Sequence, residues 1–196
     1  MNPGELVDRV KVMRYIRDEG GNYAWVHAKS IWAKAELTAK TSIYAKFGQS
    51  AGQVLFTARK RAYALGDMLY WDGGMHYVVG IRPINRMYVT LDTARVSVRT
   101  CTAKPVRVTY NALNRPVYTD APAYTLQVIA AERYYGSSQD TPQTTTRRTL
   151  VLVTPKDIDL KAGDLIEFDD ADYVIRVRHD LDDIKREYEI ERKDDV

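Results

Sequence analysis

Two stretches of the chain share one hairpin pattern, and the distance between them constrains the fold more than any other feature of the sequence. Residues 66–72 read GDMLYWD and residues 163–169 read GDLIEFD. Each stretch is an apolar run that ends in an Asp-containing turn, and each is followed by a tyrosine and a β-branched pair, at Tyr77 and at Tyr173. The glycines at 66 and 163 are 97 residues apart, and the tyrosines at 77 and 173 are 96 apart. We interpret the pattern as an internal duplication that divides the chain into two units, residues 1–98 and residues 99–196.

The apolar positions upstream keep the same phase, and phase decides which face of a strand is buried. At an offset of 96 (10 to 106), the paired residues are Val10 and Val106, Val12 and Val108, Val54 and Leu150, and Phe56 and Leu152. This alignment makes residues 106–108 the first strand of the second unit and residues 95–105 the connector between the units. A chance similarity between two β hairpins is the simpler alternative.

Short β-rich runs dominate both units. In the first unit, Asp72 and Gly73 separate the apolar runs 68–71 and 75–79. Asp-Gly between two such runs is the strongest short-range signal of a hairpin. The 14 tyrosines and the many β-branched residues suit the half-buried surface of a sheet. The sequence therefore predicts a mainly β protein.

A long polar segment interrupts each unit at the same place, at residues 38–52 and at residues 134–148. Segments of this length are uncommon in small units unless they are functional or disordered. The units also differ in charge, because residues 1–98 carry 14 Lys and Arg against 8 Asp and Glu, whereas residues 99–196 carry 15 against 18. Two units that face different environments would explain this difference, and so would uneven surface charge without a role.

The chain carries no feature of a membrane or secreted protein. No apolar run approaches the roughly 18–20 residues that a membrane span needs. Residues 1–10 lack the apolar segment of a secretory signal. The single cysteine, Cys101, excludes an internal disulfide framework. We therefore expect a reducing compartment and no membrane partner.

No constellation of residues indicates catalysis or metal binding. His27, His76 and His179 lie far apart in sequence, and no carboxylate stands at ligand spacing from a pair of them. The acids of residues 169–172 are better explained as turn residues that accept local backbone hydrogen bonds. Residues 180–183 lack the glycine and the final glutamate of a calcium-binding loop. We predict that the protein is not an enzyme and has no catalytic, cofactor-binding or metal-ligating residues.

Two basic runs are candidates for contact with nucleic acid. Arg59, Lys60 and Arg61 form one run, and Arg147 and Arg148 form the other. Such runs can face phosphates. No RNP-like aromatic motif or zinc finger accompanies them. Solvated strand ends are the simpler interpretation.

An ordered set of elements extends over roughly the first 95 residues. It comprises residues 1–6 (MNPGEL), Arg9 and Val10, residues 18–21, Trp25, residues 31–37 (IWAKAEL), a variable insertion, residues 54–57, and Asp72 and Gly73 ahead of residues 77–79. In order and approximate spacing, this set resembles the head–tail joining proteins of long-tailed bacteriophages, also called head-completion or stopper proteins. The resemblance implies a small β-barrel, so the expected architecture is two small β-barrel units in tandem with long inserted loops.

The resemblance also implies a function. Such proteins form a homo-oligomeric ring at the neck of the virion, between the portal-side adaptor protein and the tail terminator or tail completion protein. The ring closes the DNA channel after packaging and provides the platform where the tail docks, and packaged DNA passes through its lumen. The implied location is the virion neck, with assembly in the host cytoplasm.

The resemblance, together with the chemistry of ring assembly, indicates candidate interface residues. An N-terminal docking element comprises Met1, Asn2, Pro3, Gly4, Glu5 and Leu6. The insertion of the first unit supplies lumen or neighbour contacts in this family, and tyrosines offer large contact area at low rotamer entropy. The candidate assembly or lumen residues are Lys40, Tyr44, Lys46, Tyr134, Tyr135, Arg147 and Arg148.

The second unit departs from the family, whose members are typically single domains. Its Asp-Gly turn has become Asp169 and Asp170. Six copies of a two-unit chain would present twelve similar barrels, which leaves a six- or twelvefold ring as the expectation. A tail terminator or baseplate ring protein is the nearest alternative. A nucleic-acid-binding β-barrel module is an alternative from another class.

Overall fold

The computed structural model describes residues 3–38, 53–134, 148–180 and 183–193. The chain divides into two compact units, the first comprising Met1–Ile16 and Ala24–Val98 and the second comprising Arg17–Tyr23 and Arg99–Val196. The tip of the first hairpin is thereby grouped with the second unit, where Thr125 donates its backbone N–H to Oδ1 of Asn22 at 2.9 Å.

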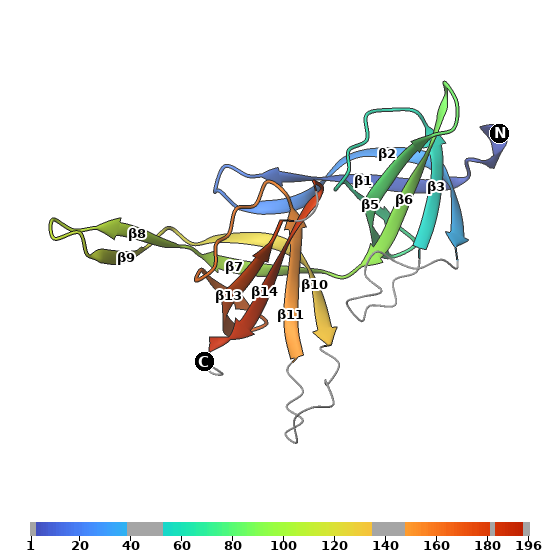
Figure 1. Ribbon diagram of the computed structural model, residues 1–196. Helices are drawn as coiled ribbons and strands as arrows, with labels where there is room; N and C mark the ends of the chain where they lie inside the picture. The colour runs from blue at the N-terminus through green and yellow to red at the C-terminus, as the bar shows by residue number, and fades with distance from the viewer. Residues whose placement is uncertain (1–2, 39–52, 135–147, 181–182, 194–196) are drawn as a thin grey trace, which may run out of the picture. The chain divides into compact units, whose positions relative to one another are not determined.

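The first unit is a closed six-stranded β-barrel (Figure 1). Its strands are β1 (Asp8–Arg17), β2 (Tyr23–Thr38), β3 (Gln53–Arg59), β4 (Met68–Trp71), β5 (Gly74–Pro83) and β6 (Tyr88–Val96), preceded by the short 3-10 helix η1 (Pro3–Glu5). They are ordered β1-β4-β5-β6-β3-β2, and the pairing of β1 with β2 closes the barrel. Closure leaves no unpaired edge strand in this barrel.

The second unit repeats this topology. Its barrel strands are β7 (Val98–Lys104), β10 (Tyr124–Tyr134), β11 (Arg148–Pro155), β12 (Leu165–Phe168), β13 (Ala171–His179) and β14 (Lys185–Arg192). They are ordered β7-β12-β13-β14-β11-β10, and β10 pairs with β7. Each position in this order corresponds to one of the first barrel. The expectation of a mainly β fold with barrel units is confirmed.

One element has no counterpart among the described residues of the first unit. Strands β8 (Val106–Tyr110) and β9 (Pro116–Asp120) form a separate two-stranded sheet between β7 and β10. We call residues Val106–Asp120 the hairpin arm. In Figure 1 it extends away from the strands of its own barrel.

Alternation of apolar residues along the strands fills each barrel interior. In the first unit, Val10, Val12 and Phe56 are fully buried within one apolar cluster. In the second, Leu126, Ile166 and Ile190 occupy comparable inward positions with at most 1% exposure. Each such side chain contributes about 1.5–3 kcal/mol by burial.

The Gly-Asp pattern forms the same turn in both units. Gly66 and Gly163 adopt φ angles of 88° and 94°, a region that glycine occupies without strain. The carboxylate of Asp67 accepts the backbone N–H of Ala64 at 2.9 Å, and that of Asp164 accepts the N–H of Lys161 at 2.8 Å. The main chain after each Asp enters β4 and β12, respectively.

The backbone around these turns also matches. The carbonyl of Asp67 accepts the N–H of Val78 at 2.9 Å, and the carbonyl of Asp164 accepts the N–H of Ile175 at 3.0 Å. The bulges of β5 and β13 fall between residues 78 and 80 and between residues 175 and 177. The two barrels therefore share register as well as strand order.

The start of the second barrel differs from the sequence expectation. Val12 pairs with Leu69 on β4, and the equivalent pair on β7 and β12 is Ala103 with Ile166. The counterparts of Val10 and Val12 are therefore Cys101 and Ala103, which are also buried. Residues 95–105 are not a connector, because β7 occupies Val98–Lys104, and residues 106–108 belong to the hairpin arm.

The physical reason for this error is that the hairpin arm also alternates apolar and polar residues. A period of two reports a strand with two unlike faces, and it does not report which sheet the strand joins.

Candidate functional site

The residues with reactive or metal-binding side chains do not converge. Within the described ranges, no group of three or more His, Cys, Asp or Glu side chains is placed to hold a metal ion. His76 is buried, and His27 contacts Ser30 on the surface at 3.2 Å. Burial raises the pKa of the Cys101 thiol to about 12, so this cysteine stays protonated at neutral pH.

The first acidic run forms a turn in which the carboxylates of Asp169 and Asp172 face cations of the protein. Asp169 and Asp170 adopt φ angles of 47° and 60°, as the two central residues of a tight hairpin turn do. Arg99 lies 3.8 Å from Asp169, and Lys104 lies 3.3 Å from Asp172. Asp169 and Asp172 therefore have partners within their own barrel.

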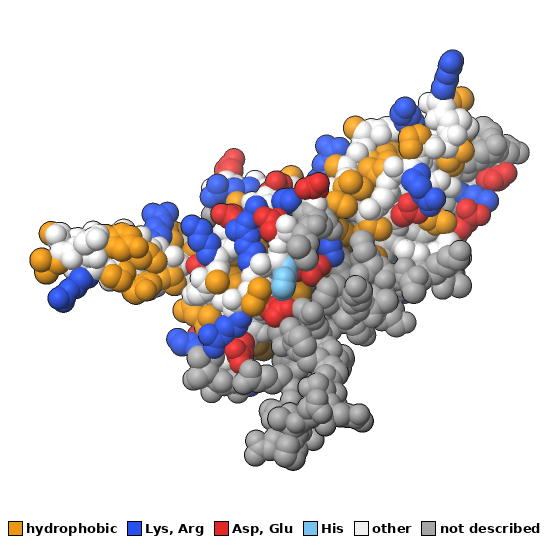
Figure 2. Space-filling view, viewed as in Figure 1, with side chains coloured by type: hydrophobic (Ala, Val, Ile, Leu, Met, Phe, Trp, Pro, Cys, Tyr) orange, Lys and Arg blue, Asp and Glu red, His pale blue; other side chains and the backbone are white. Residues whose placement is uncertain are grey.

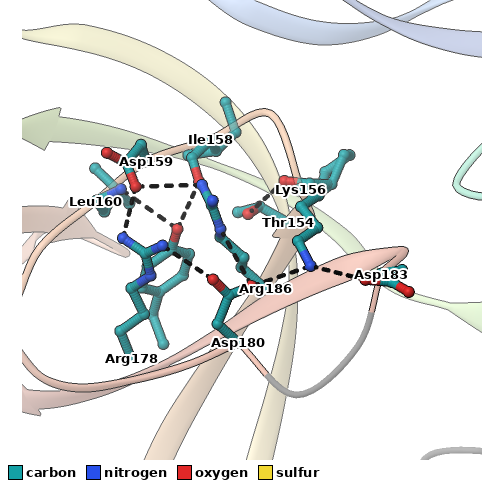
Figure 3. A network of polar contacts seen from close by, with 11 residues as sticks. Thr154, Lys156, Ile158, Asp159, Leu160, Arg178, Asp180, Asp183 and Arg186 are labelled. Carbon is teal, nitrogen blue, oxygen red and sulfur yellow. Dashed lines mark hydrogen bonds and ion pairs between the residues drawn. The ribbon is translucent and has the colours of Figure 1, made fainter.

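The second acidic run belongs to a network of ion pairs on the second barrel (Figure 3). Arg178 bridges Asp159 at 2.5 Å and Asp180 at 3.1 Å. Lys156 lies 3.3 Å from Asp180 and 3.3 Å from Asp183. The hydrogen bond from Arg178, followed by Lys156, holds the pKa of Asp180 below its usual value. With Arg186 of β14, which lies 3.2 Å from Asp159, the network joins the β11–β12 connection to β13 and β14.

The same connection is anchored from the inside by Tyr188. Its hydroxyl donates to the carbonyl of Ile158 at 2.7 Å and accepts the backbone N–H of Leu160 at 3.3 Å. Tyr188 is fully buried. The polar contacts of this region therefore have a structural role.

The hairpin arm presents an apolar face that nothing in its own unit covers. Val108 pairs with Tyr118, and Tyr110 pairs with Pro116, so these four side chains share one face. Tyr110 and Tyr118 are 68% and 69% exposed, and Val108 is 48% exposed. The opposite face carries the pairs Arg107 with Thr119 and Thr109 with Val117. Figure 2 shows hydrophobic side chains gathered over this arm.

Both ends of the arm are held by hydrogen bonds. At its tip, Oδ1 of Asn111 accepts the backbone N–H groups of Leu113 and Arg115, each at 3.0 Å. At its base, the N–H of Val106 donates to Oδ1 of Asp164 at 2.9 Å. The arm is thus an ordered element joined to the Gly-Asp turn of its barrel.

The second surface feature is a hollow of about 290 Å³ on the first barrel. We call it the basic hollow, and its lining residues are Leu6, Ser30, Ile31, Trp32, Arg59, Arg61 and Tyr63. Ala33 on β2 pairs with Ala58 on β3, so Trp32 and Arg59 are the next residues along these neighbouring strands. Trp32 is 59% exposed although it is the largest side chain of the set.

Few of the predicted assembly residues fall within the described ranges. Lys40, Tyr44, Lys46, Tyr135, Arg147, Met1 and Asn2 lie outside them. Tyr134 ends β10 and Arg148 begins β11, and the structure pairs these two residues across the strands.

The remaining predicted residues lie near the start of the first barrel. Pro3, Gly4 and Glu5 form η1, and Oε2 of Glu5 lies 3.6 Å from Nζ of Lys34. Leu6 follows η1 and lines the basic hollow.

Sequence reasoning missed the hairpin arm and the partners of the basic run. The arm had a signal, because the segment NALNRP separates two β runs and contains Asn111 and Asn114, which favour turns. No sequence signal indicated that Trp32 and Tyr63 lie beside Arg59 and Arg61, because these residues come from separate segments that only the closed barrel brings together.

Comparisons with known proteins identify no family. No protein-family model matches the chain, and no curated protein matches it. Among solved structures, the chain is similar to protein SF1141 from Shigella flexneri 2a, determined in solution, with 19% identity, a TM-score of 0.37 and coverage of 48% of this chain and 96% of that chain. A likeness at this level carries no argument about function. Within the described residues, no helix has the length and apolar character needed to cross a membrane.

Proposed function

We propose that the protein is a structural component of a bacteriophage neck. In this role it forms a ring in the head–tail connector that closes the DNA channel after packaging and provides the platform for tail docking. The ordered residue pattern of the first 95 residues supports this proposal, as does its agreement with a small β-barrel fold. Among the described candidates for acid, base or nucleophile chemistry, His76 and Cys101 are buried, and Asp169, Asp172 and Asp180 lie in ion pairs.

The hairpin arm is the observation that carries an assembly role. A two-stranded sheet by itself is marginally stable in water, and its exposed edges and apolar face favour association with another chain. A face formed by Val108, Tyr110 and Tyr118 offers large contact area with few rotatable bonds. The arm is therefore suited to be completed by a neighbouring molecule.

The proposed partners follow from that role. Further copies of the chain complete a six- or twelvefold ring, and heterologous contacts close such rings without a self-complementary patch. The portal-side adaptor and the tail terminator or tail completion protein lie on either side of the ring, with packaged DNA in its lumen. The proposed location is the virion neck, reached by assembly in the host cytoplasm.

Genetic complementation tests the proposal in the phage that encodes this chain. Without the chain, we expect lysates to contain separate heads and tails, because the docking platform is missing. A plasmid-borne wild-type copy restores joined particles. The double variant Val108→Thr with Tyr118→Thr fails to restore them, because threonine keeps strand propensity but removes most of the apolar contact.

The matched control substitutes the polar face of the same arm. Arg107→Thr with Val117→Thr also places two threonines on β8 and β9, and it restores joined particles. Normal particles in the absence of the chain would contradict the neck role. Tails of abnormal length would instead assign the protein to tail termination, and complete tails without baseplates would assign it to the baseplate.

A further inference from the structure

The basic hollow is built around a turn that two cations brace. The segment after β3 runs from Lys60 to Tyr63, and the hydroxyl of Tyr63 donates to the carbonyl of Arg59 at 3.1 Å. Nζ of Lys29 donates to the carbonyl of Ala62 at 2.7 Å and lies 4.7 Å from the centre of the Tyr63 ring. Nη2 of Arg14 donates to the same carbonyl at 3.4 Å. These hydrogen bonds hold the turn, and with it one wall of the hollow, in a fixed position.

Positive charge accumulates at this turn. Burial lowers the pKa of Lys29, and the neighbouring charges of Arg14 and Arg61 lower that pKa further, against the opposing effect of Asp67. Asp67 is the nearby carboxylate, and it is 5% exposed and lies 3.8 Å from Arg14. Asp67 pairs with Arg14 and its charge acts on Lys29, and within the described residues it forms no ion pair with Arg59 or Arg61.

The arginines of the hollow lack acidic partners within the described part of the chain. The ion pairs of the first barrel join Arg14 to Asp67, Lys34 to Glu5 and Glu36, and Arg82 to Asp92. None of them includes Arg59, Lys60 or Arg61, and all three side chains are exposed. A concave surface lined by cations concentrates anions, because the field lines converge in it.

The aromatic residues narrow the choice of anion. Trp32 exposes a broad face beside Arg59, and Tyr63 lies next to Arg61 in the lining. An acidic peptide would satisfy the arginines and leave the face of Trp32 in water. A nucleic-acid strand carries both a phosphate and a planar base, and base stacking on aromatic side chains beside a basic groove is how proteins bind single strands without sequence preference.

We propose that the basic hollow binds one nucleotide unit of a single nucleic-acid strand, with its phosphate against Arg59 and Arg61 and its base against Trp32. A volume of about 290 Å³ lies at the small end of ligand pockets, which suits one nucleotide unit of a longer strand. The proposal stands on the geometry of the first barrel and does not rest on the neck function.

Fluorescence anisotropy of a 5′-labelled oligothymidine tests the proposal on the full-length chain. We expect saturable binding at about 50 mM NaCl and much weaker binding at about 200 mM, because neutralised phosphates release counterions. Arg59→Gln with Arg61→Gln weakens binding by at least about tenfold and reduces the slope of log affinity against log salt by about 1–2. Trp32→Ala weakens binding by about tenfold, whereas Trp32→Phe retains most of it.

The charge control removes two other exposed arginines. Arg86 and Arg107 lie outside the hollow and form no ion pair within the described residues. We expect Arg86→Gln with Arg107→Gln to change binding by less than about twofold at the same net charge. Circular dichroism melting of each variant reports whether the barrels remain folded.

Three outcomes would overturn the proposal. One is the absence of an anisotropy change at low salt, and another is an equal loss of binding in the hollow variant and in the control. The third is displacement of the oligonucleotide by polyglutamate at equal charge concentration, which would show that the hollow selects charge and not a nucleotide. Failure of the neck proposal alone would leave these binding results unchanged.

Discussion

At the scale of single residues, His76 is a buried titratable side chain of the first barrel. It is 3% exposed, and the centre of its ring lies 5.6 Å from that of Phe56 and 6.0 Å from that of Trp71. Burial lowers the pKa of His76 to about 4, and the positive charge of Arg95 acts in the same direction. The imidazole is therefore neutral in the folded protein across the physiological range.

This shift makes stability depend on pH in a defined window. The folded pKa lies below the unfolded value of 6.5, so the unfolded state binds more protons between pH 6.5 and about pH 4. The free energy of unfolding of the first barrel is highest above pH 6.5. It decreases by about 3 kcal/mol as the pH falls to 4. We expect His76→Phe to flatten this part of the curve in urea unfolding at several pH values. An unchanged slope in the variant would contradict the assignment.

The repeated aspartates show what local sequence can predict. Asp67 and Asp164 were found from the Gly-Asp pattern, and each closes its turn through a residue three positions earlier. Burial raises the pKa of Asp67, although the hydrogen bond from Ala64 opposes the shift. Such turn hydrogen bonds can be predicted from sequence because they join residues only a few positions apart. The basic hollow was not readable, since Leu6, Trp32 and Tyr63 meet only after the barrel closes.

At the scale of elements, the two hairpin turns form a natural comparison. Asp72 and Gly73 have φ angles of 46° and 68°, and Asp169 and Asp170 have 47° and 60°. The second residue of each turn thus adopts a left-handed conformation, which costs a non-glycine residue up to about 1–2 kcal/mol and Asp somewhat less.

Asp170→Gly should therefore stabilise the second barrel by about 0.5–1 kcal/mol, because glycine adopts this conformation freely. The reciprocal change, Gly73→Asp, should destabilise the first barrel by a similar amount, since a Cβ at Gly73 meets no atom within 4 Å and only the backbone cost remains. Thermal unfolding of both variants checks this pair. A loss of stability in Asp170→Gly would show that its side chain contributes more than the turn geometry costs.

The strands at the junction of the units show where sequence reasoning ended. The Gly-Asp turns and the matching of Val54 with Leu150 and of Phe56 with Leu152 predicted equivalent elements. The matching of Tyr77 with Tyr173 was wrong by one residue, because Tyr77 pairs with Met68 whereas Val174 pairs with the equivalent Leu165. The prediction of the first strand of the second barrel was wrong, because β7 and β8 both alternate buried or apolar residues with polar ones. The first lines a barrel through Cys101 and Ala103, and the second exposes its apolar side. Only the pairing partners, β12 for β7 and β9 for β8, distinguish the two strands.

At the scale of the whole molecule, two barrels of the same topology occur in one chain of 196 residues. The second barrel carries the hairpin arm and the ion-pair network, whereas the first carries the basic hollow. This division accords with the charge difference between the halves of the sequence. The barrels supply rigid frames, and the surfaces that differ between them are those to which we assign contacts with other molecules.

The location of the chain in a virus particle tests the proposed function most directly. Immunogold labelling of the virus particles released by cells that carry the gene for this chain, with antibody against the hairpin-arm segment and against a barrel segment, tests this location by electron microscopy. The neck proposal predicts gold at the junction of head and tail. Gold at the tail tip, or particles that carry no gold after mild disruption that exposes the neck, would contradict it.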